Sequence, residues 1–180
     1  QLPLNSSLIF IFITIFVDML GYGIMLPLLP FYVQAQSGGA AIAGALSSLY
    51  ASAQLFAGPV LGALSDRYGR RPVLLVCLLG TSFGYLLLGL ADSLPLIFLA
   101  VLIDGLTGGN LTTAYAYIAD VTTTENRARG MGMVGAAFGL GLMAGPALGG
   151  LLSPYGLYVP AFTASAIALS NVIFGYFVLP

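Results

Sequence analysis

The stretch PVLLVCLLGTSFGYLLLGLA, residues 72–91, is a run of 20 residues without a charged side chain. A helix needs roughly 20 mainly apolar residues to cross the hydrocarbon core of a bilayer, so this stretch predicts a transmembrane helix. Further apolar stretches lie on both sides of it, separated by Gly, Pro, Ser or charged residues. We predict an all-α membrane protein with six transmembrane helices, near residues 8–33, 41–64, 72–91, 95–119, 128–152 and 158–179.

The composition agrees with a protein that lies in lipid. Hydrophobic residues make up 59% of the chain and charged residues 6%, and the mean hydropathy is +1.02, far from the averages of soluble domains. The net charge is −1, and no basic face is present to bind the phosphates of nucleic acid, so we exclude a nucleic-acid partner.

The sequence also lacks the parts of several enzyme classes. Cys77 is the single cysteine and the chain contains no His, so neither a disulfide framework nor a thiolate metal site is expected. A Walker-type phosphate loop and the HExxH zinc motif are absent from the sequence. We therefore predict a protein that is not an enzyme, holds no metal or cofactor, and draws on an ion gradient.

The arginines predict the orientation in the membrane. All five basic residues are Arg, and they lie in the connections between helices two and three and between helices four and five. Loops rich in Lys and Arg face the cytoplasm, which places both termini there as well. Thr122 and Glu125 have the spacing of a capping box that would open helix five.

An internal repeat predicts the symmetry of the helices. AGPVLGALSDRYG (57–69) matches AGPALGGLLSPYG (144–156) at eight of thirteen positions, with an offset of 87. Three helices separate the two copies, so the second copy crosses the membrane in the opposite direction, as in three-plus-three inverted repeats. We expect one transmembrane domain over residues 1–180, with repeat units near 8–91 and 95–179.

Two acidic residues are expected deep in the membrane. Asp18 and Asp104 lie about ten and nine residues into their helices, which places each ~15 Å deep. An ionised carboxylate there costs at least ~2.5 kcal/mol, so we expect both to face a polar cavity and to exchange protons. Fixing helix packing by hydrogen bonds is the alternative role. Gln54 and Asn110 are further cavity candidates, with interhelical hydrogen bonding as their alternative.

The stretch GALSDRYGRRPVLL, residues 62–75, resembles the loop signature of the major facilitator superfamily. The resemblance implies a gating loop whose ion pairs latch the outward-facing state, with glycine allowing close approach of helices. Asp120 at the end of helix four is available to pair with Arg70; enforcing membrane topology is the alternative role of these charges. The implied gating residues are Gly62, Asp66, Arg67, Gly69, Arg70, Arg71 and Asp120.

Two more motifs resemble drug:proton antiporters with twelve helices. The glycine and prolines of LGYGIMLPLLP (20–30) are spaced like those in helix one of these antiporters. A series of glycines and one proline in helix five resembles their antiporter motif. With GLTGGN (105–110), these stretches resemble the tetracycline-resistance exporters, many of which carry Arg where this chain has Val101. The helix-five motif residues are Gly132, Gly141, Gly145, Pro146, Gly149 and Gly150.

The resemblance implies one half of a transporter that moves a small drug-like or amphipathic compound outward by alternating access, coupled to protons. The expected partners are the bilayer and a second six-helix half, either the C-terminal half of the same protein or a second copy. The expected location is the bacterial cytoplasmic membrane, with a cavity lined mainly by helices one, two, four and five. A metabolite importer or uniporter and a non-transporting membrane scaffold are the alternatives.

Overall fold

A computed structural model describes residues 4–108, 110–156 and 158–178, all of which are helical apart from short connections. Helix one is α1 followed by a 3₁₀ turn and α2, helix four is α5 followed by α6, and a second 3₁₀ turn follows α7. The elements are α1 (Leu4–Met25), η1 (Leu26–Leu28), α2 (Leu29–Ala35), α3 (Ala40–Tyr68), α4 (Arg70–Leu90), α5 (Leu94–Leu106), α6 (Asn110–Val121), α7 (Arg127–Leu152), η2 (Ser153–Tyr155) and α8 (Tyr158–Val178).

Helix four differs from the prediction of one continuous helix over 95–119. The described part of the chain contains five helical stretches long and apolar enough to cross a membrane, and the fourth span is instead divided into α5 and α6. α5 has 13 residues and α6 has 12. The division falls within GLTGGN (105–110), where consecutive glycines weaken the helix.

Two helix ends also differ from the sequence prediction. Helix one changes to a 3₁₀ turn at Leu26–Leu28, because the ring of Pro27 removes a backbone donor and clashes with the preceding turn. The predicted capping box does not form, because the Thr122 hydroxyl donates to the carbonyl of Ile118, 2.6 Å away. α7 begins at Arg127 instead, without a side-chain hydrogen bond from the preceding Asn126.

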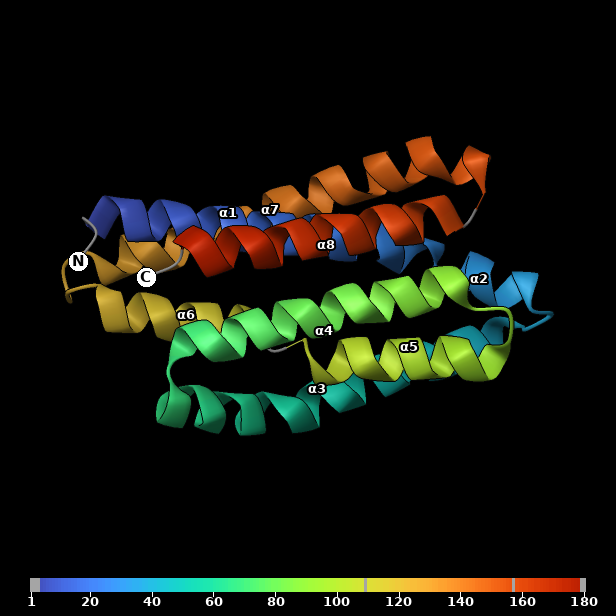
Figure 1. Cartoon of the computed structure of the whole chain (residues 1–180), viewed down its shortest axis with the longest axis horizontal. Coiled ribbons are helices and arrows are strands. Elements are labelled where there is room, and N and C mark those ends of the chain that lie inside the picture. The colour runs from blue at the N-terminus through green and yellow to red at the C-terminus, as the bar shows by residue number, and fades with distance from the viewer. Residues whose placement is uncertain (1–3, 109, 157, 179–180) are drawn as a thin grey trace.

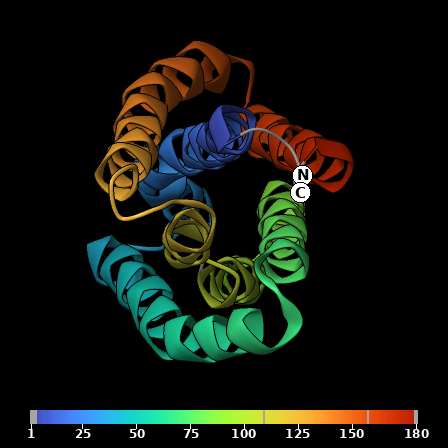
Figure 2. The ribbon, with the colours of Figure 1, turned by 90° about the vertical axis from the view of Figure 1, so that its left-hand side faces the viewer.

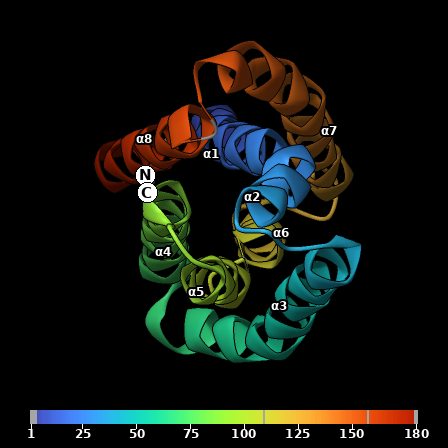
Figure 3. The same cartoon turned by 90° about the vertical axis from the view of Figure 1, so that its right-hand side faces the viewer.

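The helices pack in the pairs that an inverted repeat requires. α1 packs on α7 as α5 packs on α3, α1 packs on α8 as α5 packs on α4, and α4 packs directly on α8. Seen from the two ends, α4 and α8 lie side by side, and α3 and α7 form two arms that curve along the outside of the bundle (Figures 2 and 3). The fold is thus the all-α bundle that the sequence predicts.

The α1–α7 contact depends on glycine. A Cβ atom at Gly141 would lie 2.6 Å from the Cβ of Met19, and a Cβ atom at Gly149 would lie 3.1 Å from the carbonyl oxygen of Ile24. Small residues let transmembrane helices approach closely enough for backbone contact, which replaces the hydrophobic force that is missing inside lipid. The contact fixes helix one, which carries Asp18, against helix five.

Polar side chains join α4 to α8 inside the bundle. Ser82 donates to the carbonyl oxygen of Ser165 at 2.9 Å, and Ser165 donates to the carbonyl oxygen of Ser82 at 2.8 Å. Both side chains are buried. This reciprocal pair ties helices three and six, which are equivalent in the repeat.

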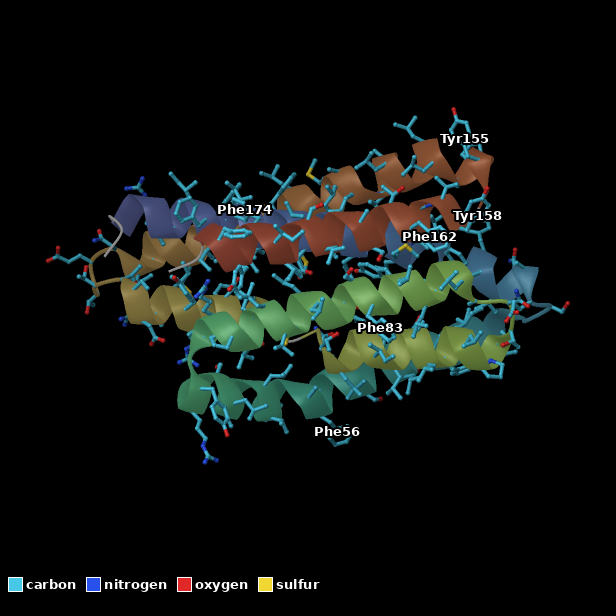
Figure 4. All side chains as sticks on the ribbon, in the orientation of Figure 1. Phe56, Phe83, Tyr155, Tyr158, Phe162 and Phe174 are labelled. Atoms are coloured by element: carbon cyan, nitrogen blue, oxygen red, sulfur yellow. The ribbon has the colours of Figure 1, made fainter. Side chains whose placement is uncertain are left out.

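The outer faces and the two ends differ in chemistry. Figure 1 shows the α3–α4 turn, the α6–α7 connection and both labelled termini at the same end of the bundle. The arginine clusters therefore share one end. Phe56 projects outward from α3, with 76% of its surface exposed, and Tyr155 projects outward from η2 at the opposite end (Figure 4). Aromatic residues at the end of a span, such as Tyr155, suit the membrane–water interface.

Candidate functional site

A two-lobed cavity opens between helices one, two, three and four. The outer lobe has a volume of about 270 Å³ and reaches toward η1, with Leu26, Leu29 and Val101 in its lining. The inner lobe has a volume of about 210 Å³ and includes Asp18 and Thr81. Both lobes share five lining residues, so they meet at one constriction: Tyr22, Tyr50, Gln54, Tyr85 and Asp104.

Both predicted membrane acids lie in this cavity. Asp18 comes from α1 and is 6% exposed, and Asp104 comes from α5 and lines both lobes. Thr81 of α4 lines the inner lobe together with both acids. The residues that line the two lobes include no Arg and no Lys. The cavity therefore places two acids near each other without a basic lining residue.

Three tyrosines of the cavity were not predicted from the sequence. The rings of Tyr22 and Tyr50 stack, with centroids 5.7 Å apart and planes inclined by 29°. Tyr85 is 3% exposed and lines both lobes. Aromatic faces beside carboxylates form a surface suited to a ligand that is apolar and positively charged.

A sequence signal for these tyrosines exists. Each follows or precedes a polar residue by four positions, which places both side chains on one helix face. The pairs are Asp18 with Tyr22, Tyr50 with Gln54, and Thr81 with Tyr85.

The predicted cavity residues Gln54 and Asn110 have different outcomes. Gln54 lines both lobes, and its side-chain nitrogen Nε2 donates to the carbonyl oxygen of Gly108 at 3.0 Å. Asn110 is the first residue of α6, directly after the break in helix four, and its side chain lies outside the described residues. The structure thus joins Gln54 to the Asp104 region.

The cavity lining corrects the prediction of which helices face it. Helix three contributes Thr81, Gly84 and Tyr85, because Gly84 brings the backbone of α4 close to Asp104. Helix five contributes Phe138 to the described lining. In this half, helix three therefore has a larger part in the cavity than its apolar sequence indicated.

The predicted gating residues gather at the α3–α4 turn. Gly69 joins the two helices with a φ of +100°, which side chains rarely adopt. Arg70 donates from Nε to Asp120 at 2.8 Å, and its Nη1 lies 2.5 Å from Asp66. The side chain of Arg70 is 18% exposed, against 67% for Asp66 and 56% for Asp120. One guanidinium thus bridges helices two, three and four.

The remaining gating candidates lie apart from that bridge. Arg71 donates from Nη2 to the carbonyl oxygen of Tyr176 near the end of α8, and its guanidinium lies over the ring of Tyr176. Arg67 lies over the exposed ring of Tyr68. Gly62 faces open space, so within this chain its lack of a side chain serves no close helix contact.

The helix-five motif divides into two faces. Gly141, Gly145 and Gly149 are buried against α1, whereas Gly132 and Gly150 face open space. Pro146 is exposed. Helix packing inside this half thus explains three of the six residues, and the others lie on a face that this half leaves uncovered.

Comparison with known proteins supports this architecture. The family model described as Major Facilitator Superfamily matches residues 11–180. "Tetracycline resistance protein, class C" of Escherichia coli is 40% identical over 178 residues, which cover 97% of this chain and 45% of that protein. "Multidrug resistance protein 2" of Bacillus subtilis (strain 168) is 33% identical over 166 residues, covering 92% of this chain and 42% of that protein.

A solved structure has a fold similar to that of this chain. The crystal structure of the human organic anion transporter MFSD10 (TETRAN) has a TM-score of 0.86 and 29% identity, covering 100% of this chain and 48% of that chain. The chain thus spans less than half the length of these relatives.

Proposed function

The chain belongs to the Major Facilitator Superfamily, and from this premise we propose that it is one half of a proton-coupled exporter of small drug-like or amphipathic compounds. Relatives that are named for tetracycline resistance and multidrug resistance support an export function. The proposal locates the half in a bacterial cytoplasmic membrane, with the arginine-rich end and both termini in the cytoplasm.

The observation that carries the proposal is the pair of carboxylates in one cavity. Asp18 and Asp104 come from different halves of the inverted repeat and line the same inner lobe. In alternating access, a proton from outside and a substrate from inside bind the same region in different states. A proton that crosses with the membrane potential supplies about 2.3 kcal/mol per 100 mV, which drives substrate outward against its gradient.

The cavity charge favours a cationic or zwitterionic substrate. Its lining contains Asp18 and Asp104 but no Arg or Lys, so an anion would meet only like charge from this half. The proposed substrate charge thus differs from that of the human structural relative, which is described as an organic anion transporter. Val101, which is 6% exposed and lines the outer lobe, leaves this cavity without a basic side chain near Asp104.

A second half would cover the exposed arms of this chain. Leu55, Phe56 and Val60 of α3 and Met143 of α7 are more than half exposed, and glycines on both helices face open space. Open glycines on a membrane-spanning helix allow another helix to approach closely, which supports an interface on these arms. The relatives' greater length supports a second half in the same polypeptide, and a second copy of this chain is the alternative partner.

Substitution of the acids in the assembled transporter tests the function. We expect Asp18→Asn and Asp104→Asn to abolish substrate-driven proton movement in proteoliposomes, while downhill substrate movement persists in at least one variant. Asp92→Asn is the matched control, because Asp92 is an exposed acid in the loop between α4 and α5. Unchanged coupling in both cavity variants would remove these acids from the mechanism.

A further inference from the structure

We propose that Gln54 is a positioning residue that clasps the break in helix four and thereby fixes Asp104 in the cavity. The inference rests on the proposed function, because it assigns Gln54 a part in coupling through Asp104. The structural observation behind it is the hydrogen bond that Gln54 Nε2 donates to the carbonyl oxygen of Gly108 at 3.0 Å. This bond connects α3 to the point where α5 has ended.

The break leaves a backbone carbonyl that requires a partner. The last turn of α5 closes on itself, because the Thr107 N–H donates to Ile103 at 3.1 Å and the Thr107 hydroxyl donates to the same carbonyl at 2.8 Å. The carbonyl of Gly108 lies beyond this turn, and it accepts from Gln54. Irregular backbone at membrane depth is tolerated where side chains satisfy it, and Gln54 supplies that donor.

The surroundings of Gly108 are tight. A Cβ atom at this position would lie 3.3 Å from the carbonyl oxygens of Asp104 and Gly105 and 3.4 Å from Gln54 Nε2. On the same face of α5, toward α3, a Cβ atom at Gly105 would lie 3.0 Å from the carbonyl oxygen of Tyr50. The end of α5 therefore packs closely on α3 and is hydrogen-bonded to it through the amide of Gln54.

Asp104 is the residue that this clasp positions. It lies one helical turn before Gly108. The Thr107 hydroxyl, which donates to Ile103, also donates to the backbone carbonyl oxygen of Asp104 over a longer distance of 3.3 Å. Gln54 and Asp104 both line the constriction between the two lobes. A rotation of the α5 end would therefore move the carboxylate relative to Asp18 and Tyr22.

The same clasp links the cavity to the gating turn. Gln54 and Asp66 belong to one helix, α3, which runs from Ala40 to Tyr68. Twelve residues separate them, or ~18 Å along a helix. A change at Asp104 that shifts the break would thus act on α3, the helix that ends in the Arg70 bridge. Two discrete arrangements of the break would give this coupling a physical basis.

Gln54→Met tests the clasp in the complete transporter, because Met has similar length and lacks the donor. Ser52→Ala is the matched control, since Ser52 is an exposed residue of α3 outside the cavity lining. We expect at least tenfold faster hydrogen exchange of amides around the break in Gln54→Met, together with a shifted pH profile of transport. Ser52→Ala keeps the parent values for both.

A double substitution separates positioning from general damage. If Gln54 acts through Asp104, Gln54→Met shifts the pH profile of transport in the parent background but causes no further change in the downhill substrate movement of Asp104→Asn. Gln54→Glu is the second variant if Gln54→Met does not fold, because it keeps the size and polarity. Its carboxyl donates to Gly108 only when protonated, so we expect transport to fall as the pH rises through its titration.

The outcomes distinguish this inference from the proposed function. A folded Gln54→Met protein with parent exchange and parent pH profile overturns the clasp, even when Asp104→Asn abolishes coupling. A further loss of downhill substrate movement when Gln54→Met is added to Asp104→Asn overturns it as well. If Gln54→Met does not fold, a pH profile of Gln54→Glu equal to that of the parent overturns it. A parent transporter without proton-coupled transport overturns the proposed function, while faster exchange at the break in Gln54→Met would still support the clasp.

Discussion

Gly23 and Gly145 bring the backbones of α1 and α7 into direct contact: a Cβ atom at position 145 would lie 2.5 Å from the Cα of Gly23. The two residues belong to motifs that the sequence alone associates with drug:proton antiporters. Their spacing thus has a packing cause inside a single half, because glycine at both positions allows the helices to cross at backbone distance. The crossing holds α1 while its neighbouring turn presents Asp18 and Tyr22 to the cavity.

Gly145→Ala is expected to destabilise the assembled transporter. The added methyl group meets the backbone of α1, which cannot yield as a flexible side chain could, so overpacking costs about 1–3 kcal/mol. We expect a lower melting temperature in detergent and a smaller fraction of monodisperse protein after heating. Ser170→Ala is the control, since Ser170 is exposed on α8 and its hydroxyl donates to the carbonyl of Ala166 in the same helix.

The control variant is expected to change the melting temperature in the opposite direction or not at all. Alanine favours a helix over serine, so Ser170→Ala keeps or raises the melting temperature. Equal melting temperatures for Gly145→Ala and the parent protein would contradict the backbone contact.

The arrangement of the spans could be predicted because hydropathy, loop charge and the repeat each depend on simple physical rules. The break in helix four could not. Glycine is frequent in transmembrane helices for packing, so Gly108 and Gly109 alone do not distinguish a close contact from an interruption. Only the position of Gln54, 54 residues away from Gly108 in the chain, supplies the donor that satisfies an interrupted helix.

The candidate site could be predicted in part. Asp18 and Asp104 are visible in sequence because ionisable groups are expensive in hydrocarbon. Tyr85 is not, because an apolar helix with serines and a tyrosine reads as lipid-facing until its partners are known. Its burial results from the packing of α4 on both α5 and α8, which is a tertiary property.

Arg70→Lys tests the bridge at the α3–α4 turn. Arginine reaches Asp120 through Nε and Asp66 through Nη1, whereas the lysine ammonium is a single point charge that cannot span both acids in the same way. We expect transport to slow ~fivefold, the rate equivalent of about 1 kcal/mol. The melting temperature changes little, because both carboxylates are exposed.

Arg67→Lys is the comparison for this variant. Arg67 is exposed beside Tyr68 in the same turn, so the substitution preserves charge at the same end of the protein. A smaller effect on the transport rate than Arg70→Lys is expected. Equal slowing in the two variants would show that the turn contributes general charge and no specific bridge.

Substitution of Tyr50 tests whether the cavity recognises positive charge. Tyr50→Phe keeps the aromatic face that stacks on Tyr22 and removes the hydroxyl group alone, whereas Tyr50→Leu removes both. A cation–π contact contributes about 0.5–2 kcal/mol, so we expect Tyr50→Leu to weaken tetraphenylphosphonium binding by roughly 2- to 30-fold and Tyr50→Phe to weaken it less.

Tetraphenylborate provides the matched probe, because it has nearly the same shape and the opposite charge. Two carboxylates without a basic lining residue repel this anion, so its binding to the purified transporter should be much weaker than that of tetraphenylphosphonium. Asp104→Asn should reduce the difference between the two ions, since it removes one of the charges that discriminate them. Equal binding of both ions by the parent protein would mean that the second half neutralises the acids, and the substrate would then be selected by shape and not by charge.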